Sequence, residues 1–158
     1  MKQLAAARRK PDRANGDSGD GQADYRLDDQ FGYILRQVTQ RHTAIFAETI
    51  PEGVTTTQFA ALVRLYEMES CSQNRLGRLT SMDAATIKGV IARLAKRGLA
   101  RTWTDPEDSR RLLVGLTEAG IALTEQAIPK AFDITDKTLE PLSERERGQL
   151  VELLLKLR

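Results

Sequence analysis

Hydrophobic residues recur every three or four positions over most of the chain beyond residue 26, the spacing of amphipathic helices. The pattern predicts a first helix over residues 27–49, ended by the turn-forming Pro51-Glu52-Gly53. A second helix is predicted from an N-cap at Thr55 or Thr56 to about Met68. Its expected apolar stripe consists of Phe59, Leu62, Val63 and Tyr66.

Two more helices follow closely. A short one is predicted after an N-cap at Ser72, and a longer one from an N-cap at Asp83 to Arg97. Gly98 stands where a left-handed helix cap is expected. The core positions expected here are Leu76, Leu79, Ile87, Val90, Ile91 and Leu94.

The hydrophobic period then changes from helical to alternating. Residues 99–104 and 112–116 read as two short strands, and the charged turn between them makes a β-hairpin. A helix is predicted over residues 117–139, with a kink at Pro129. A last helix opens with the capping box Ser143-Glu144-Arg145-Glu146. This last helix has more apolar residues than a single surface helix needs in order to pack on a core, namely Leu150, Val151, Leu153, Leu154 and Leu157.

Length and composition narrow the class of protein. The 158 residues suffice for one compact domain, and the absence of a long apolar run or signal peptide makes us expect a cytoplasmic protein. One cysteine, Cys71, and one histidine, His42, allow neither an internal disulfide nor a metal site built from these residue types. We expect no cofactor. Residues 1–24 are basic, then rich in Gly, Asp and Ser, and are expected to form a disordered tail.

The charge is unevenly distributed along the chain. Residues 71–111 hold nine basic and four acidic side chains, whereas the stretches on either side are more acidic than basic. A basic middle between acidic flanks is typical of a polyanion-binding module on a separate scaffold, and equally of a solvated surface.

The order of elements makes the first interpretation stronger. A helix, a short helix, a turn, a helix and a hairpin form a winged helix-turn-helix, in which the second helix of the pair enters the DNA major groove. The hairpin beside it can then reach the adjacent minor groove.

Two stretches resemble one known family in detail. SQNRLGRLTSMDAATIKGVIARLAKRGL at 72–99 is similar to the DNA-reading unit of the MarR family, and DPEDSRRLLVGLTEAG at 105–120 to its wing and the start of its dimerisation helix. The resemblance implies a mainly α fold with a small β-hairpin. It also implies a DNA-binding region over 55–116 and a helical dimerisation region over 25–54 and 117–158. A homodimer on a pseudo-palindromic operator of double-stranded DNA would follow.

The predicted DNA-binding residues have different roles. Thr86 and Lys88 lie in the first turns of the recognition helix, where base edges are within reach. Arg110 matches the wing-tip arginine of the family, which implies a minor-groove contact. Asp108 is expected to pair with a nearby arginine and orient the wing. The full set is Gln73, Asn74, Arg75 and Arg78 for phosphates, Ala84, Ala85 and Gly89 for close approach, Arg111 for phosphate, and also Ser72, Thr86, Lys88, Arg93, Ser109 and Arg110.

A second resemblance concerns the signal that is sensed. QFGYILRQVTQRHTAIF at 30–46 together with MDAATIK at 82–88 resembles a MarR branch that controls aromatic-acid catabolism, the nicotinate-pathway repressors. This implies 6-hydroxynicotinate or a related small aromatic carboxylate as effector. His42 shares the apolar face of the first helix and is either a core histidine or a ligand contact. The candidate effector-binding residues are His42, Val38, Arg41, Phe59, Leu62 and Arg64.

Other functions remain as alternatives. No phosphate loop, metal cluster or nucleophile–base set indicates an enzyme. A winged helix used only for protein contact, or a DNA-binding protein without an effector, is compatible with the pattern. Cys71 suggests redox sensing, but the chain has no second cysteine to resolve an oxidised thiol.

Overall fold

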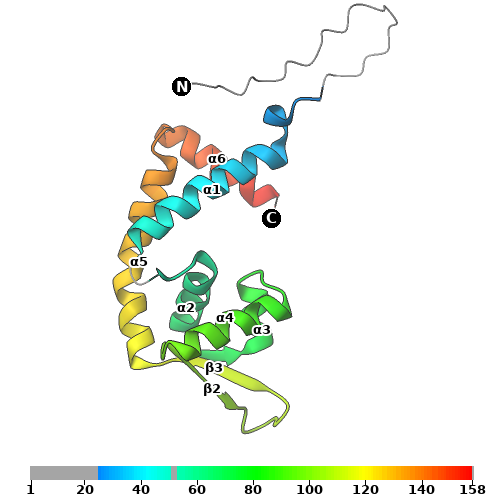
Figure 1. The fold of residues 1–158 in the computed structure, drawn as a ribbon, viewed down its shortest axis with the longest axis vertical. Helices are drawn as coiled ribbons and strands as arrows, with labels where there is room; N and C mark the ends of the chain where they lie inside the picture. Colours follow the sequence, from blue (N-terminus) through cyan, green and yellow to red (C-terminus); the bar gives the residue numbers. More distant parts are fainter. Residues whose placement is uncertain (1–24, 51–52, 158) are drawn as a thin grey trace, which may run out of the picture.

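The computed structural model describes residues 25–50 and 53–157, so the predicted N-terminal tail lies outside the described residues. Figure 1 shows the chain as two lobes joined along one side by a long helix. The elements in chain order are the 3-10 helix η1 (Leu27–Asp29), α1 (Phe31–Thr49), α2 (Thr56–Met68), β1 (Ser70–Ser72), α3 (Gln73–Leu79), α4 (Ala84–Lys96), β2 (Ala100–Thr104), β3 (Leu112–Leu116), α5 (Glu118–Leu139) and α6 (Glu144–Lys156).

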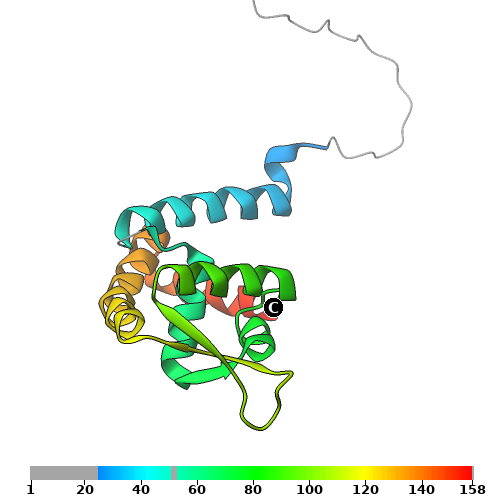
Figure 2. The ribbon, with the colours of Figure 1, turned by 60° about the horizontal axis from the view of Figure 1, so that its bottom comes forward.

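One lobe holds α2, α3, α4 and the strands, and the other holds α1, α6 and the C-terminal half of α5 (Figure 1). The hairpin of β2 and β3 extends beyond the helices on the side of α3 and α4, as Figure 2 shows after rotation. The mainly helical winged helix-turn-helix expected from the sequence is therefore present.

The sheet has a strand that the sequence pattern did not reveal. Its order is β1-β3-β2, and both pairings are antiparallel. In β1, Cys71 stands opposite Val114, which places the thiol on the buried face of the sheet. The predicted hairpin is thus part of a three-stranded sheet with β3 in the centre, and the added strand, β1, directly precedes α3.

Helix starts follow from local capping chemistry. Thr55 and Gln58 form a reciprocal capping box at α2, and the side chains of Ser72, Asp83 and Thr117 accept backbone N–H groups at α3, α4 and α5. Such caps satisfy N–H groups that have no partner inside the helix. Gly98 has φ +70°, which confirms the predicted left-handed cap after α4.

The core lies mainly in the lobe with the sheet. Leu62, Leu65, Leu76, Val90 and Leu94 have no exposed surface there. Two predicted core positions are wrong.

Leu79, at the end of α3, is 38% exposed, and Tyr66 on α2 is 39% exposed. In α2 the buried stripe includes Ala61 and Leu65 instead. The face of α2 that packs against α4 and α5 is rotated about the helix axis from the predicted face. Helix α5 continues through Pro129 as a single element.

Within residues 25–50 and 53–157, no helix is both long and apolar enough to cross a membrane. The same ranges contain no group of His, Cys, Asp and Glu side chains that could hold a metal ion.

Candidate nucleic-acid interface

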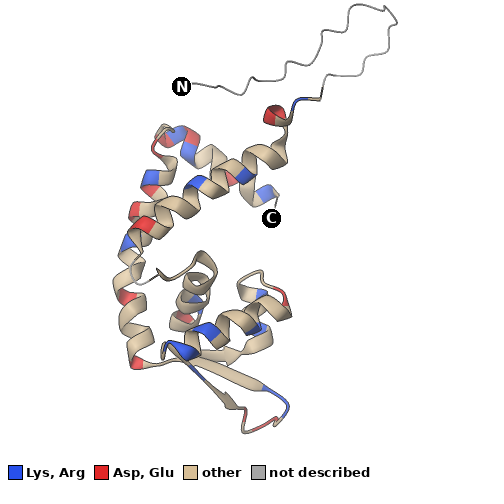
Figure 3. Ribbon diagram, in the orientation of Figure 1, with Lys and Arg blue, Asp and Glu red and all other residues tan. Residues whose placement is uncertain are grey.

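Helix α4 has one buried and one open face. Ile87, Val90, Ile91 and Leu94 are buried, whereas Ala85, Lys88 and Arg93 are exposed. Basic residues of α4, α3 and the wing appear together in the lower lobe of Figure 3. The open face of α4 thus carries small side chains in its first turn and basic side chains further along. This combination suits close approach to a polyanion.

The first turn of α4 is fixed by Asp83. Its carboxylate accepts the Thr86 backbone N–H at 2.7 Å and the Thr86 hydroxyl at 3.0 Å. These two hydrogen bonds hold the pKa of Asp83 below its ordinary value. Because the Thr86 hydroxyl hydrogen is used on Asp83, Thr86 can offer a base only its lone pairs and its methyl group.

Helix α3 begins beside the wing. Its Ser72, Gln73 and Asn74 line a polar hollow of about 190 Å³ together with Arg110, Arg111 and Leu112. The structure therefore brings together five of the predicted DNA-binding residues from two separate parts of the chain. Arg75 and Arg78 of α3 are exposed. Gly77 of α3 is tightly packed, since a Cβ there would lie 3.0 Å from the Met82 carbonyl oxygen.

The wing turn, residues 105–111, is organised by two carboxylates. Asp105 accepts hydrogen bonds from the Glu107 N–H at 3.0 Å and from the Arg111 guanidinium at 3.4 Å. Asp108 accepts the Arg110 N–H at 3.0 Å and lies 3.9 Å from the Arg111 guanidinium. Asp108 does pair with an arginine as predicted. The nearly buried Asp105, which the sequence analysis did not single out, makes the shorter contact.

These contacts separate the roles of the two wing arginines. Arg111 is held inside the turn, whereas Arg110 is exposed and its guanidinium has no ion pair within the described residues. The sequence pattern also did not reveal a cation–π contact within β2, where the Arg101 guanidinium lies 5.3 Å from the centroid of the Trp103 ring.

The candidate effector residues are dispersed in the structure. Arg41 of α1 donates to the backbone carbonyls of Lys137, at 2.9 Å, and of Thr138 in the last turn of α5. The Nδ1 atom of His42 lies 3.0 Å from the Thr138 hydroxyl oxygen. Since that hydroxyl donates to the Ile134 carbonyl, we assign the ring hydrogen to Nδ1, which leaves the Nε2 lone pair for another donor.

The other candidates lie elsewhere. Val38 and Arg41 line an apolar groove of about 460 Å³ between α1, the end of α5 and α6. Leu62 is fully buried, and the Phe59 ring makes an edge contact with Phe46 at 5.6 Å between centroids. Arg64 is exposed on α2 and paired with Glu67 at 2.7 Å. The structure thus does not gather the six residues around one cavity.

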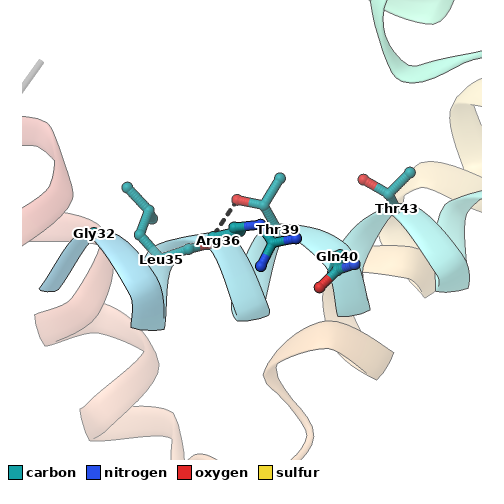
Figure 4. Close-up of a pocket in the computed structure, with 6 residues that line it drawn as sticks. All are labelled: Gly32, Leu35, Arg36, Thr39, Gln40 and Thr43. Atoms are coloured by element: carbon teal, nitrogen blue, oxygen red, sulfur yellow. Dashed lines mark hydrogen bonds between the residues drawn. The ribbon is translucent and has the colours of Figure 1, made fainter. Parts of the chain in front are cut away.

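A different face of α1 is hollowed. A depression of about 480 Å³ runs along Gly32, Leu35, Arg36, Thr39, Gln40 and Thr43 (Figure 4). Arg36 is exposed and makes no ion pair within the described part of the chain. Residues 32, 36, 39, 40 and 43 follow helical spacing, which could have pointed to this polar face beside the apolar one.

Cys71 does not have the environment of a reactive thiol. It is 5% exposed, and burial raises the pKa of its thiol despite the nearby positive charge of Arg75. A raised pKa lowers the thiolate fraction on which oxidation depends.

The fold and the basic face together define a winged helix-turn-helix protein. Residues 54–112 match the model of the MarR family. The HTH-type transcriptional repressor NicR of Pseudomonas putida is 38% identical to this chain over 134 residues, which cover 84% of this chain and 85% of NicR. The chain belongs to the MarR family of transcription regulators, which confirms both resemblances seen in the sequence and excludes the enzyme alternative.

Solved structures agree with this assignment. A probable transcriptional regulator from Pseudomonas aeruginosa is 55% identical, with a TM-score of 0.80, and the match covers 84% of this chain and 100% of that one. BpsR of Bordetella bronchiseptica, whose DNA binding is regulated by 6-hydroxynicotinic acid, is 41% identical with a TM-score of 0.80, covering 85% and 97%.

Proposed function

We propose that this chain is a homodimeric, sequence-specific DNA-binding repressor that a small aromatic carboxylate releases from its operator. The observation that carries the proposal is that basic residues of α3, α4 and the wing gather in one lobe (Figure 3), with Arg110 exposed in the turn of that wing. Because its proposed partner is DNA, we further propose that the protein acts in the cytoplasm.

In this proposal α4 enters the major groove. Lys88 and Thr86 face base edges, and Ala84, Ala85 and Gly89 let the helix backbone approach closely. At Gly89 a Cβ would meet only the flexible Arg93 guanidinium, at 3.6 Å, so the surface there is open. The residues around the start of α3 contact phosphates and fix the register, while Arg110 enters the minor groove.

The apolar surface of the other lobe supports a dimer. Along α1, α6 and the C-cap of α6, several large hydrophobic side chains are between 44% and 69% exposed, namely Phe31, Ile34, Val38, Val151, Leu153, Leu154, Leu155 and Leu157. We propose that residues 25–54 and 117–158 pair with a second copy, and that each DNA-binding region, 55–116, reads one half-site. Two-fold symmetry then requires a pseudo-palindromic operator.

For the effector we propose the hollow along α1. Arg36 supplies a guanidinium that makes no ion pair among the residues the structure describes, which suits a carboxylate, and Leu35 supplies apolar surface for a ring. His42 stays a candidate through its Nε2 lone pair, which can accept from a ligand hydroxyl. The similarity to NicR and to BpsR, which responds to 6-hydroxynicotinic acid, favours 6-hydroxynicotinate as the first ligand to test.

The test uses fluorescence anisotropy with DNA from the region upstream of the gene. We expect saturable binding in which the logarithm of the affinity falls linearly with the logarithm of the salt concentration. The slope should correspond to several neutralised phosphates per half-site. Lys88→Ala and Arg110→Ala should each weaken binding by about 1–3 kcal/mol, whereas Lys130→Ala on α5 should not. Binding that is absent at low salt would favour the alternative of a protein-interaction module.

A second titration tests the effector. Saturating 6-hydroxynicotinate should lower operator affinity, and Arg36→Ala should weaken ligand binding measured by calorimetry without DNA. An operator affinity that is the same with and without ligand would favour a ligand-independent DNA-binding protein, because a ligand shifts an equilibrium only through its differential affinity.

A further inference from the structure

Helix α5 is fixed to the DNA-binding lobe at its first turn. The Thr117 hydroxyl donates to the Gly98 carbonyl at 2.6 Å and accepts the Gly120 N–H at 3.1 Å. Gly120 packs so closely that a Cβ would lie 2.0 Å from the Leu99 carbonyl oxygen. Because Gly98 and Leu99 directly follow the recognition helix, the start of α5 is joined to the end of α4 through main-chain contact.

The other end of α5 is held by α1. Arg41 donates to the carbonyls of Lys137 and Thr138, two groups that the helix itself leaves without partners. A cation at a helix C-terminus also interacts favourably with the helix dipole. His42 adds its contact to the Thr138 side chain. Arg41 and His42 are consecutive, so one turn of α1 makes all of these contacts.

Between these two ends α5 is one helix. Its 22 residues span about 33 Å at 1.5 Å per residue. It packs against α1 and α2, and Figure 1 shows it running along the side of both lobes. A displacement of α1 therefore moves the end of α5 directly, and α5, which continues through Pro129 as one helix, carries that movement toward the end of α4.

We propose that Arg41 is a positioning residue that couples α1 to the recognition helix through α5, and not a residue that binds the effector. The proposal rests on the proposed function, because it concerns how a ligand on α1 changes DNA binding. The hollow along α1 and the contacts of Arg41 lie on different faces of the same helix. A ligand in the hollow can thus shift α1 without touching Arg41.

The experiment measures the ratio of operator dissociation constants with and without saturating 6-hydroxynicotinate. In the unmodified protein we expect a ratio of at least about ten, within the usual range of allosteric coupling. In Arg41→Ala the ratio should fall to about one, while the ligand affinity measured by calorimetry without DNA stays within about twofold. Arg41→Lys, which keeps the charge but can reach fewer carbonyls, should retain part of the ratio.

Arg145→Ala is the matched control, because Arg145 is exposed on α6 and makes no ion pair within the described residues. It should keep the full ratio. A full ratio in Arg41→Ala, or a large loss of ligand affinity, overturns the proposal. If Arg41→Ala fails to fold by circular dichroism, Arg41→Lys and Arg41→Gln decide by the same criteria. A ratio of one in the unmodified protein would instead refute the proposed effector response.

Discussion

The Asp105 carboxylate accepts a hydrogen bond from the Arg111 guanidinium, 3.4 Å away, across the turn of the wing. The Asp105 side chain is only 10% exposed, whereas that of Arg111 is 54% exposed. The two backbones are also joined, because the Asp105 N–H donates to the Arg111 carbonyl at 2.9 Å. This pair closes the loop and leaves Ser109 and Arg110 at its tip.

Asp105→Asn should therefore weaken DNA binding without removing a DNA contact. We expect a loss of about 1 kcal/mol in operator affinity, because the amide replaces a charged acceptor with a weaker one. The number of phosphates neutralised, read from the salt dependence, should not change. Anisotropy titrations at several salt concentrations measure both quantities.

Glu107→Gln is the control for this prediction, since it removes a carboxylate from the same turn but breaks no described side-chain contact. It should leave operator affinity unchanged or slightly increased, because one negative charge near DNA is lost. If both variants behave alike, Asp105 acts only through its charge and does not organise the wing.

The contribution of Asp83, the N-cap of α4, to the stability of the fold should depend on pH. Hydrogen bonds from Thr86 hold the pKa of Asp83 below its ordinary value in the folded state. A carboxyl group with a depressed folded-state pKa stabilises the fold above its unfolded pKa, and loses that contribution as the pH falls through the folded one. The stability difference between the unmodified protein and Asp83→Asn should thus be constant above about pH 5 and shrink at lower pH.

Urea unfolding at constant ionic strength and several pH values measures this difference. Asparagine is itself a good N-cap, so the substitution isolates the effect of charge. Glu146 has a lowered pKa for a similar reason, its hydrogen bonds with Ser143, and Glu146→Gln gives a second curve for comparison. A stability difference for Asp83→Asn that does not change with pH would contradict the role of the Asp83 charge.

Much of the fold could be predicted because its determinants are local. The N-caps at Thr55, Asp83 and Ser143 and the left-handed Gly98 depend on residues within one helical turn, so the sequence displays them directly. The strand β1 was missed because it has three residues, two of them serines, and its pairing partner is some 40 positions away.

The same reasoning explains what the sequence did not show about the candidate sites. Helical spacing placed His42 on the apolar face of α1 and gave Arg41 only as a neighbouring candidate, but the partners of both are 96 to 97 positions away on α5. A charged turn was visible at the wing, but not which of its carboxylates is nearly buried. Leu79 follows the helical period and is still exposed, because α3 ends there.

Gly120 should be one of the least replaceable positions in the chain. A Cβ at this position would lie 2.0 Å from the Leu99 carbonyl oxygen, and neither backbone can move without disturbing the contact between α4 and α5. Gly120→Ala should destabilise the protein by at least about 2–3 kcal/mol, as overpacking against backbone does. Denaturant unfolding measures the change.

Gly148 provides the matched control within α6. A Cβ there meets no atom within 4 Å, so Gly148→Ala should stabilise the helix by about 0.5–1 kcal/mol through helix propensity alone. Equal effects of the two substitutions would show that the contact between Gly120 and Leu99 is looser than the structure describes.

The exposed leucines of α6 should determine the oligomeric state. Leu153 is 57% exposed and borders the groove that Val38 and Leu150 also line, so a partner helix would cover it. We expect the protein to sediment as a dimer at micromolar concentration.

Leu153→Glu should raise the dimer dissociation constant at least about a hundredfold, because two-fold symmetry removes two buried leucines at about 1.5–3 kcal/mol each. Leu79→Glu, the same change at a 38% exposed position on α3 in the DNA-binding region, should remain dimeric. Sedimentation velocity distinguishes the two variants. If the unmodified protein sediments as a monomer, this contradicts both the proposed dimer and the proposed pseudo-palindromic operator.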